Sequence, residues 1–338
     1  MASITLDWND YLKKATEVVE EGCVLLENKN QCLPFIKDTK VAIFGRIQKH
    51  YYKSGTGSGG MVNVSKVVDI VEGLKNTNHI KIDSELETLY ENWEKENPFE
   101  QGLGWGNDPT CQKEMPISLE EAEYYAKQND IALVILGRLA GEDMDNTPEE
   151  GSWLLTKLEK QLLENVRKAF SKVCVVLNVG NIIDMNFVKE YNIDAVLYSW
   201  QGGIIGGQGV ANVLTGLATP SGKLSDTIAK SIEDYPSHKN FGNPEAETYQ
   251  EDIYVGYRYF ETFAKDKVLY PFGYGLSYTN FEILKKSFSY DFPNINLEIE
   301  VKNTGKYSGK EVVQCYLGLP QGKLGKPEKT LCGFKKTK

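Results

Sequence analysis

At residues 131–137 the chain reads Ile131-Ala132-Leu133-Val134-Ile135-Leu136-Gly137, and at residues 141–147 it reads Gly141-Glu142-Asp143-Met144-Asp145-Asn146-Thr147. The first stretch is an unbroken apolar run, as in strands that are buried on both faces of a parallel sheet. Open α/β sheets carry their binding and catalytic groups just beyond the carboxyl ends of such strands. We therefore expect the acidic loop 141–147 to lie at the functional edge of an α/β fold.

This loop concentrates three carboxylates, those of Glu142, Asp143 and Asp145. Carboxylates this close repel one another, so at least one is expected to have a raised pKa and to hold a proton near neutral pH. Such a group could act as an acid catalyst. A structural role is the alternative, because Asp and Asn are common turn formers and helix N-caps and residues 147–150, Thr-Pro-Glu-Glu, resemble a helix start.

Strand and helix patterns alternate along most of the chain. Further apolar runs predict strands at residues 40–45, 173–178 and 194–199. Helical spacing and helix-forming composition predict helices at residues 11–26, 62–74, 85–95, 117–128, 152–170, from 182, and at 208–216. This alternation indicates an α/β fold with a mostly parallel sheet between helices, an α/β sandwich of the flavodoxin-like kind.

The pattern changes after about residue 285. Residues 295–301 alternate strictly between apolar and polar side chains, turn residues follow at 303–305, and 312–317 are again β-formers. Short strands of period two joined by turns predict a β-sandwich. The segment is only about half as long as the roughly 100 residues of a full sandwich. We therefore expect two domains, an α/β domain at 1–284 and an incomplete β-sandwich at 285–338.

Composition excludes several classes of partner. The 338 residues are 41% hydrophobic and 25% charged, with a net charge of −9, as in an ordinary globular protein. No basic tract could neutralise a phosphate backbone, so nucleic acid is not an expected partner. No apolar run approaches the roughly 20 residues of a membrane span. The amino-terminal residues lack the basic stretch and apolar core of a secretory signal, which favours the cytoplasm.

Cysteine and histidine give little support to metal or disulfide chemistry. The six cysteines form no CxxC pair, and the three histidines are not at ligand spacing from one another. We interpret the cysteines as reduced, mostly structural thiols. We expect no metal site and no cofactor.

A glycine-rich loop, Gly55-Thr56-Gly57-Ser58-Gly59-Gly60, formally matches the dinucleotide pattern G-x-G-x-x-G. That pattern must follow its strand directly, whereas residues 46–54 intervene here. A loop that brings backbone N–H groups and the Ser58 hydroxyl to a polar ligand fits better. A second loop, residues 200–207, is interpreted equally well as a tight turn or as a ligand loop.

A set of motifs in fixed order carries a family resemblance. The motifs are Ile135-Leu136-Gly137-Arg138 with Gly141-Glu142, Leu177-Asn178-Val179-Gly180, Ser199-Trp200-Gln201-Gly202-Gly203, and the segments 216–224, 251–259 and 271–278. Together they resemble the C-terminal α/β-sandwich domain of glycoside hydrolase family 3, the β-glucosidase group. The segments 301–305, 309–314 and 327–334 resemble the start of the fibronectin type III-like domain that follows it in that family.

The resemblance implies a missing partner. Family 3 enzymes carry a (β/α)8 barrel with the nucleophilic aspartate and most sugar-binding residues, and no equivalent segment is found here. Because residues 21–28 resemble the segment that opens the α/β domain and lie close to Met1, the chain is similar to permuted members in which the barrel comes last. The barrel is then expected in the continuing chain or in a separate one. A deliberately shortened chain or a truncated gene product is the alternative.

The resemblance also implies a mechanism and assigns roles. Retaining glycosidases use a nucleophilic carboxylate and an acid/base carboxylate about 5–5.5 Å apart. Glu142 is the position that matches the acid/base, in preference to Asp143 and Asp145, which are expected to position it, to bind substrate or to cap a helix. Ser58 and its neighbour Gly57 match a loop that reaches the sugar.

Several other residues are weaker candidates. Sugars stack on aromatic rings, so Tyr51, Tyr52, Trp105 and Trp200 are site candidates, although aromatic residues more often belong to a core or an interface. Arg46 and Gln48 follow the first parallel strand and could face the barrel.

Two functions of different class remain open. The first is the acid/base-bearing part of a retaining β-glucosidase-type hydrolase that cleaves terminal β-linked sugars and is inactive without its barrel. The second is a non-catalytic carbohydrate-binding or scaffold module of the same fold. A flavodoxin-like nucleotide or flavin binder is a more distant alternative, and assembly into homo-oligomers is left open.

Overall fold

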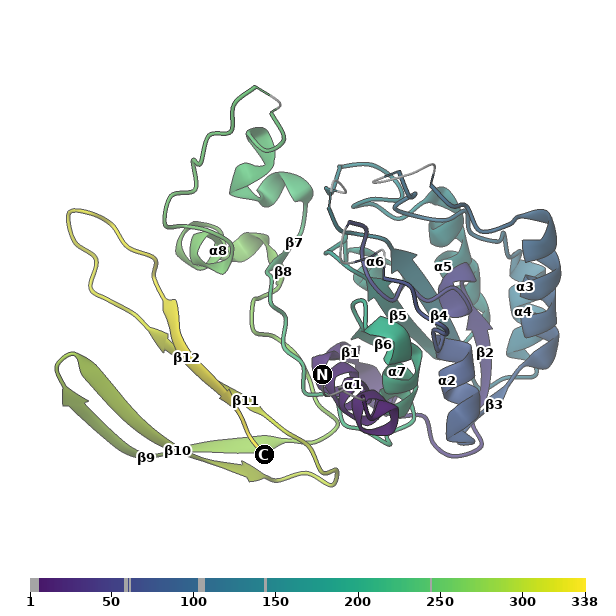
Figure 1. Ribbon diagram of the computed structural model, residues 1–338, viewed down its shortest axis with the longest axis horizontal. Coiled ribbons are helices and arrows are strands. Elements are labelled where there is room, and N and C mark those ends of the chain that lie inside the picture. The colour runs from purple at the N-terminus through teal and green to yellow at the C-terminus, as the bar shows by residue number, and fades with distance from the viewer. Residues whose placement is uncertain (1–5, 58–59, 61, 103–106, 143–144, 244) are drawn as a thin grey trace, which may run out of the picture.

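The structure is a computed structural model that describes residues 6–57, 60, 62–102, 107–142, 145–243 and 245–338. Its centre is a six-stranded sheet with the order β1-β6-β5-β4-β2-β3 (Figure 1). These strands are β1 (Val24–Asn28), β2 (Lys40–Phe44), β3 (Lys81–Ile82), β4 (Ile131–Arg138), β5 (Val173–Val179) and β6 (Ala195–Tyr198). Neighbours are parallel except for β1, which is antiparallel to β6. The predicted mostly parallel sheet is confirmed.

Helices cover both faces of this sheet. One face carries α1 (Trp8–Gly22), α2 (Ile70–Thr77) and α7 (Gly206–Leu214), and the other carries α3 (Ser84–Glu96), α4 (Leu119–Ala126), α5 (Lys157–Ala169) and α6 (Phe187–Glu190). The side chains of β4 divide between two apolar cores in strict alternation, with 132, 134 and 136 in one and 131, 133 and 135 in the other. Because successive side chains of a strand point to opposite faces, an unbroken apolar run is required here.

Helix α5 begins later than its sequence pattern predicts. Thr156 is its N-cap and forms a capping box with Glu159, an arrangement that satisfies two otherwise unpaired backbone N–H groups. Residues 147–150 form no helix. The acidic loop therefore does not cap α5, and the interpretation of 147–150 as a helix start is wrong.

Two other helix boundaries differ from prediction. The helix expected over 11–26 ends at Gly22, and the apolar residues after it form the edge strand β1. The helix expected over 62–74 covers only Ile70–Thr77, with Asp69 as its N-cap. In the first case, pairing with β6 decides the conformation of a short apolar run that suits either state.

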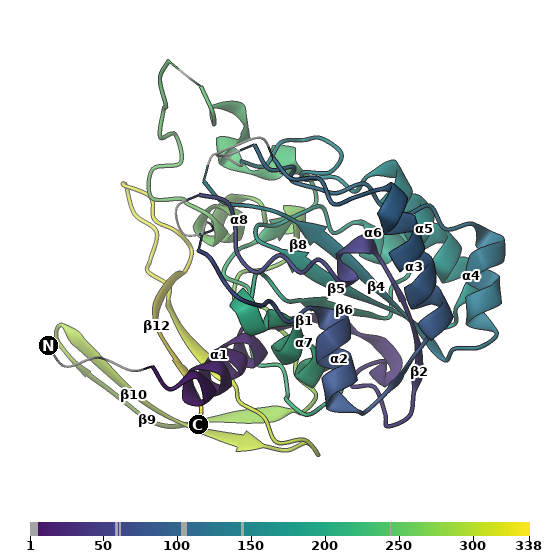
Figure 2. The same ribbon diagram turned by 45° about the vertical axis from the view of Figure 1, so that its right-hand side comes forward.

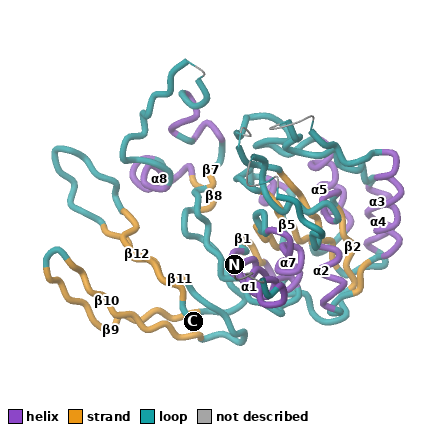
Figure 3. Tube along the Cα trace, viewed as in Figure 1, coloured by secondary structure: helices purple, strands orange, loops and turns teal. Residues whose placement is uncertain are grey.

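The carboxyl-terminal third adds small elements beside the sheet domain. They are β7 (Ile228–Ala229), α8 (Tyr257–Phe263), β8 (Val268–Tyr270), and two antiparallel hairpins, β9 (Phe281–Asp291) with β10 (Asn294–Asn303) and β11 (Val312–Leu317) with β12 (Thr330–Lys336). Figures 2 and 3 show both hairpins outside the helix-covered sheet, on the side away from α3 and α4. The expected β-formers are thus found, and β9 begins before the predicted domain boundary at residue 285.

Candidate active site

Four loops meet at the carboxyl edge of the sheet. They follow β2, β4, β5 and β6, whose parallel pairing brings their carboxyl ends to one side. The loop after β4 is the acidic segment, and the loop after β2 is the glycine-rich one. The structure places both loops at the edge that the strand pattern predicts.

Glu142 lies against the glycine-rich loop. Thr56 forms a parallel bridge with Gly141. Its N–H donates to the carbonyl of Ala140 at 2.8 Å, and its hydroxyl donates to the carbonyl of Glu142 at 2.9 Å. Gly57 has a φ of +93°, and a Cβ atom there would stand 2.6 Å from both Cβ and Oε2 of Glu142. Only glycine combines this backbone conformation with so close an approach.

The remaining predicted site residues are less closely grouped. Glu142 and Asp145 are both exposed, so their carboxyl groups are accessible to a ligand. Asp145 lines a hollow of about 480 Å³ that does not include Gly57. Ser58 and Asp143 lie outside the described residues. The structure therefore brings Glu142 and Gly57 together. Asp145 lies in a hollow that Gly57 does not line.

A buried ion pair anchors the acidic loop. Arg138, the last residue of β4, donates to both oxygens of Glu159 at 2.6 and 2.7 Å. It also donates to the carbonyls of Ser152 and Leu154, both at 3.3 Å. Burial alone would lower the pKa of Arg138, but the Glu159 carboxylate raises it above its ordinary value. One guanidinium thus joins the start of the loop to its end and to α5.

Arg46 and Gln48 do not face outward, and that prediction is wrong. Both are 1% exposed within the 3₁₀ turn η2 (Arg46–Gln48). The Arg46 guanidinium lies 5.1 Å from the ring centre of Trp93 and 5.6 Å from that of Phe99. It also donates to two backbone carbonyls in the loop after α3. Cation–π contacts and these hydrogen bonds stabilise the buried charge.

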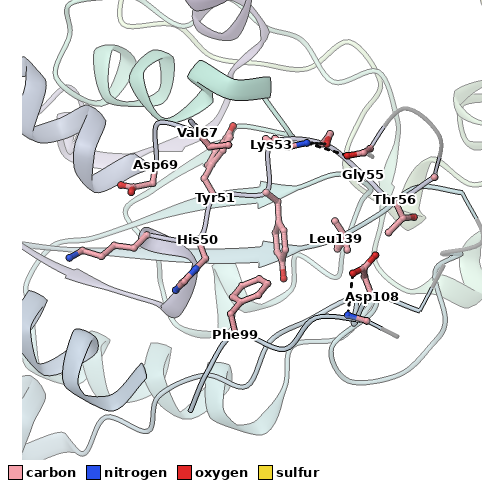
Figure 4. A pocket seen from close by; sticks show the side chains of 16 residues that line it. His50, Tyr51, Lys53, Gly55, Thr56, Val67, Asp69, Phe99, Asp108 and Leu139 are labelled. Carbon is pink, nitrogen blue, oxygen red and sulfur yellow. Dashed lines mark hydrogen bonds between the residues drawn. The ribbon is translucent and has the colours of Figure 1, made fainter. Parts of the chain in front are cut away.

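A cavity of about 630 Å³ lies beside the glycine-rich loop (Figure 4). Four rings line it, those of His50, Tyr51, Tyr52 and Phe99. The ring centre of Phe99 lies 4.8 Å from that of His50 and 6.1 Å from that of Tyr52. Figure 4 shows Thr56 and Leu139 at the side where the two loops meet. Phe99 was not predicted from the sequence, because it lies in a loop and reaches the cavity only through tertiary packing.

The aromatic candidates have mixed outcomes. Tyr51 and Tyr52 are buried, and the Tyr51 hydroxyl accepts the N–H of Gly202 at 2.9 Å. Trp200 is half-buried, with its ring centre 4.5 Å from that of Tyr198. Trp105 lies outside the described residues. Both Tyr51 and Tyr52 line the cavity (Figure 4), and the Tyr51 hydroxyl also joins this wall to the loop after β6.

Asn178 belongs to the motif at residues 177–180, and the sequence alone predicts no role for it. It is the last residue but one of β5, is fully buried, and bonds to the loops after β2 and β6. A sequence signal does exist, because a polar residue lies near the carboxyl end of an otherwise apolar strand, at the edge where ligands bind. That signal gives the position but not the partners.

Thiols and clusters of acidic residues add no further centre. All six cysteines are free thiols. Within the described ranges, no three His, Cys, Asp or Glu side chains come together as a metal site would require. Over the same ranges, no helix has both the length and the apolar character needed to cross a bilayer.

Comparison with known proteins decides the family. The model of the glycosyl hydrolase family 3 C-terminal domain matches residues 23–278. The chain belongs to glycosyl hydrolase family 3. This match covers the sheet, the acidic loop and the glycine-rich loop, and it confirms the resemblance seen in the sequence motifs.

Relatives of this family 3 chain include several β-glucosidases. It is 53% identical over 335 residues to a β-glucosidase of Ruminococcus albus, and this match covers 99% of the present chain and 35% of the relative. It is 39% identical to β-glucosidase A of Butyrivibrio fibrisolvens, covering 97% of this chain and 44% of the relative. The chain therefore spans less than half the length of these relatives.

Solved structures of family 3 enzymes have the same fold. A β-glucosidase from Paenibacillus barengoltzii superimposes with a TM-score of 0.96 at 48% identity, covering 100% of this chain and 37% of the other. β-Glucosidase 3B from Thermotoga neapolitana, in complex with glucose, superimposes with a TM-score of 0.91 at 36% identity. This match covers 99% of the present chain and 47% of the other. Both likenesses extend over the hairpins as well as the sheet domain.

Proposed function

We propose that the chain supplies the acid/base loop of a retaining β-glucosidase-type enzyme whose nucleophile lies on a (β/α)8 barrel outside this sequence. The observation that carries the proposal is the contact of Glu142 with Gly57 at the carboxyl edge of the sheet. It places an exposed carboxyl group where two loops contact each other, in a chain whose relatives include β-glucosidases. The substrate class is a terminal β-linked glucosyl or related sugar.

Glu142 has two tasks in this mechanism. As an acid it protonates the glycosidic oxygen while the barrel carboxylate attacks the anomeric carbon, and as a base it then activates the water that releases the sugar. The exposure of Glu142 supports the proposal, because the barrel and the substrate must cover this edge before the proton is transferred. Neighbouring Asp143 and Asp145, with Gly57 and Ser58, would position the acid and the sugar.

The proposal also includes the carboxyl-terminal domain and the compartment of the protein. The hairpins β9–β10 and β11–β12 support a partial fibronectin type III-like unit over 285–338. Six free thiols support a reducing compartment such as the cytoplasm.

The test joins this chain to the part of the Ruminococcus albus relative that it does not cover. Glu142→Gln should lower kcat/KM for cellobiose by about 10²–10⁴-fold, the usual range for general acid catalysis. It should change kcat/KM for a dinitrophenyl β-glucoside much less, because that leaving group departs without a proton. Steady-state hydrolysis of the two substrates measures the difference.

Two controls make the assignment specific. Glu149→Gln removes an exposed carboxylate from the same loop and should leave both rates near those of the parent. If Asp145→Asn lowers kcat/KM for cellobiose much more than that for the dinitrophenyl β-glucoside, and Glu142→Gln does not, Asp145 is the acid. A joined protein that binds sugars but hydrolyses neither substrate would instead establish the non-catalytic module.

A further inference from the structure

The carboxamide of Asn178 uses its acceptor and both its donors inside the protein. Its Oδ1 accepts the N–H of Tyr52 at 2.7 Å. Its Nδ2 donates to the carbonyl of Tyr52 at 3.1 Å and to that of Trp200 at 2.7 Å. Asn178 is 0% exposed, so water cannot replace any of these bonds. One side chain at the end of β5 thus holds the backbone of two neighbouring loops.

The first of these loops leads directly to Glu142. Tyr52 lies four residues before Thr56, the residue that bonds to Ala140 and Glu142 of the acidic loop. Asn178 hydrogen-bonds both the N–H and the carbonyl of Tyr52. These two bonds fix the position and the orientation of the Tyr52 backbone relative to β5. The position of Tyr52 therefore limits where Thr56 can meet the acidic loop.

The second loop reinforces the first. Trp200 has a φ of +55°, a left-handed conformation that is uncommon for a bulky residue and persists only where surrounding contacts enforce it. Its carbonyl is held by Asn178. The N–H of Gly203 then donates to the carbonyl of Lys53 at 2.8 Å. The loops after β2 and β6 thus form a single bonded unit around one amide.

We propose that Asn178 is a positioning residue for Glu142, acting through Tyr52 and Thr56 without contact with the substrate. This inference rests on the proposed function of Glu142 for its catalytic consequence. A displacement of about 1 Å in a catalytic group can reduce a rate by about 10²-fold. The bonds from Asn178 restrict the loop that determines this placement.

The chemistry of the site requires an amide. Aspartate at this position has almost the same shape, but its second oxygen faces the carbonyls of Tyr52 and Trp200 and cannot donate to both. Leucine fills the space and leaves the N–H and both carbonyls without partners. Asn178→Asp therefore loses the two hydrogen bonds that the amide donates, Asn178→Leu loses all three, and each should displace the loop.

Hydrogen exchange on the 338-residue chain tests the coupling without any catalysis. In Asn178→Asp the backbone amides of residues 50–57 and 139–142 should exchange at least about tenfold faster than in the parent, while those of β4 and β5 keep their protection. Asn165→Asp is the matched control, because Asn165 is also buried and donates to the carbonyl of Ile117, away from these loops. Unchanged exchange over 139–142 would overturn the inference.

Kinetics of the joined enzyme test the catalytic consequence. Asn178→Asp should lower kcat/KM for cellobiose by about 10- to 100-fold and that for a dinitrophenyl β-glucoside by a much smaller factor, because only the first needs a well-placed acid. A merely structural defect would lower both equally, as expected for Asn165→Asp if it destabilises the fold. Equal losses in Asn178→Asp would overturn the positioning role.

The two experiments separate the two proposals. If the joined parent enzyme hydrolyses neither glycoside, the proposed function fails, and exchange over 139–142 still decides whether Asn178 holds the acidic loop. If the parent is active and exchange accelerates without a difference between the substrates, the positioning role of Asn178 in acid catalysis is refuted while the proposed function stands.

Discussion

At the scale of single residues, Glu114 is a buried carboxyl group that contacts the backbone just after β2. It is 5% exposed. The backbone N–H of Arg46 donates to both of its carboxyl oxygens, at 3.0 and 3.2 Å, and the backbone N–H of Met115 donates to one of them at 2.8 Å. Burial raises its pKa from 4.5 to about 8, against the opposing effect of these hydrogen bonds. The native protein thus holds a proton here that the unfolded chain releases.

This proton predicts a pH dependence of stability. Between about pH 4.5 and 8 the native state binds one proton more than the unfolded state, so the free energy of unfolding falls by about 1.4 kcal/mol per pH unit from this group as the pH rises. In Glu114→Gln this contribution is absent. Urea unfolding at several pH values should show the parent losing stability relative to the variant across that window, and parallel curves would contradict the buried proton.

A second prediction concerns the contact between Gly57 and Glu142. Alanine at 57 brings a Cβ within 2.6 Å of the Glu142 side chain at a φ of +93°, so the acid must move. Gly242→Ala is the control, because Gly242 also has a positive φ, +77°, but has open space around it. Both variants should lose about 1 kcal/mol of stability from backbone strain. Only Gly57→Ala should lose activity toward cellobiose in the joined enzyme, and equal activity would show that Glu142 tolerates displacement.

At the scale of elements, the junction of β4, the acidic loop and α5 depends on the Arg138–Glu159 pair. Glu159→Gln leaves a buried guanidinium without its counter-charge, which costs about 3–5 kcal/mol of unfolding free energy. Glu164→Gln, on the same helix, removes an exposed pair with Lys168 that is worth about 0.3–0.5 kcal/mol. Chemical denaturation compares the two, and similar midpoints would show that the buried pair adds no net stability.

Elements with a strong period were predictable, and those decided by distant partners were not. The strand expected at 131–137 is observed at Ile131–Arg138. Its short, unbroken apolar run is typical of a strand that is buried on both faces. Residues 24–28 continue the apolar content of α1, and only the register with β6 makes them a strand. The start of α5 was misplaced because the sequence offers several acidic residues near it and only one capping box forms.

The candidate site was predictable in position and only partly in contacts. Strand order places the acidic loop at the edge, and the family motifs select Glu142 and Gly57. Arg46 was misplaced because an arginine is normally exposed, and its aromatic partners come from α3 and the loop after it. Asn178 was left without a role because its partners lie on other strands' loops, which only the folded sheet brings within reach.

At the scale of the whole molecule, the two hairpins differ in how they are held. β11–β12 is tied to the sheet domain by Lys336 and Lys310, which both pair with Glu21, and by Lys223 with Glu311. β9–β10 pairs along its length only with itself among the described strands, and its apolar side chains such as Phe288 and Leu297 are exposed. An isolated two-stranded hairpin has marginal stability.

Backbone exchange should therefore separate the hairpins. We expect the amides of β9–β10 to exchange near the rate of an unfolded peptide and those of β11–β12 to be protected. Glu21→Gln should accelerate exchange in β11–β12 and leave β9–β10 unchanged. Limited proteolysis between 279 and 303 would then precede cleavage elsewhere, which also tests the domain boundary expected at 284–285. Equal protection of both hairpins would contradict this view.

The antiparallel edge strand has a consequence for synthesis. Val24 pairs with Tyr198 and Asn28 with Ala195, so about half of the chain must leave the ribosome after β1 before its neighbour exists. At roughly 5–20 residues per second, this delay is on the order of ten seconds or more. The nascent chain can assemble β2, β4 and β5 during that time, while the apolar residues of β1 wait unpaired. The sheet is therefore completed at this edge only after β6 has been synthesised.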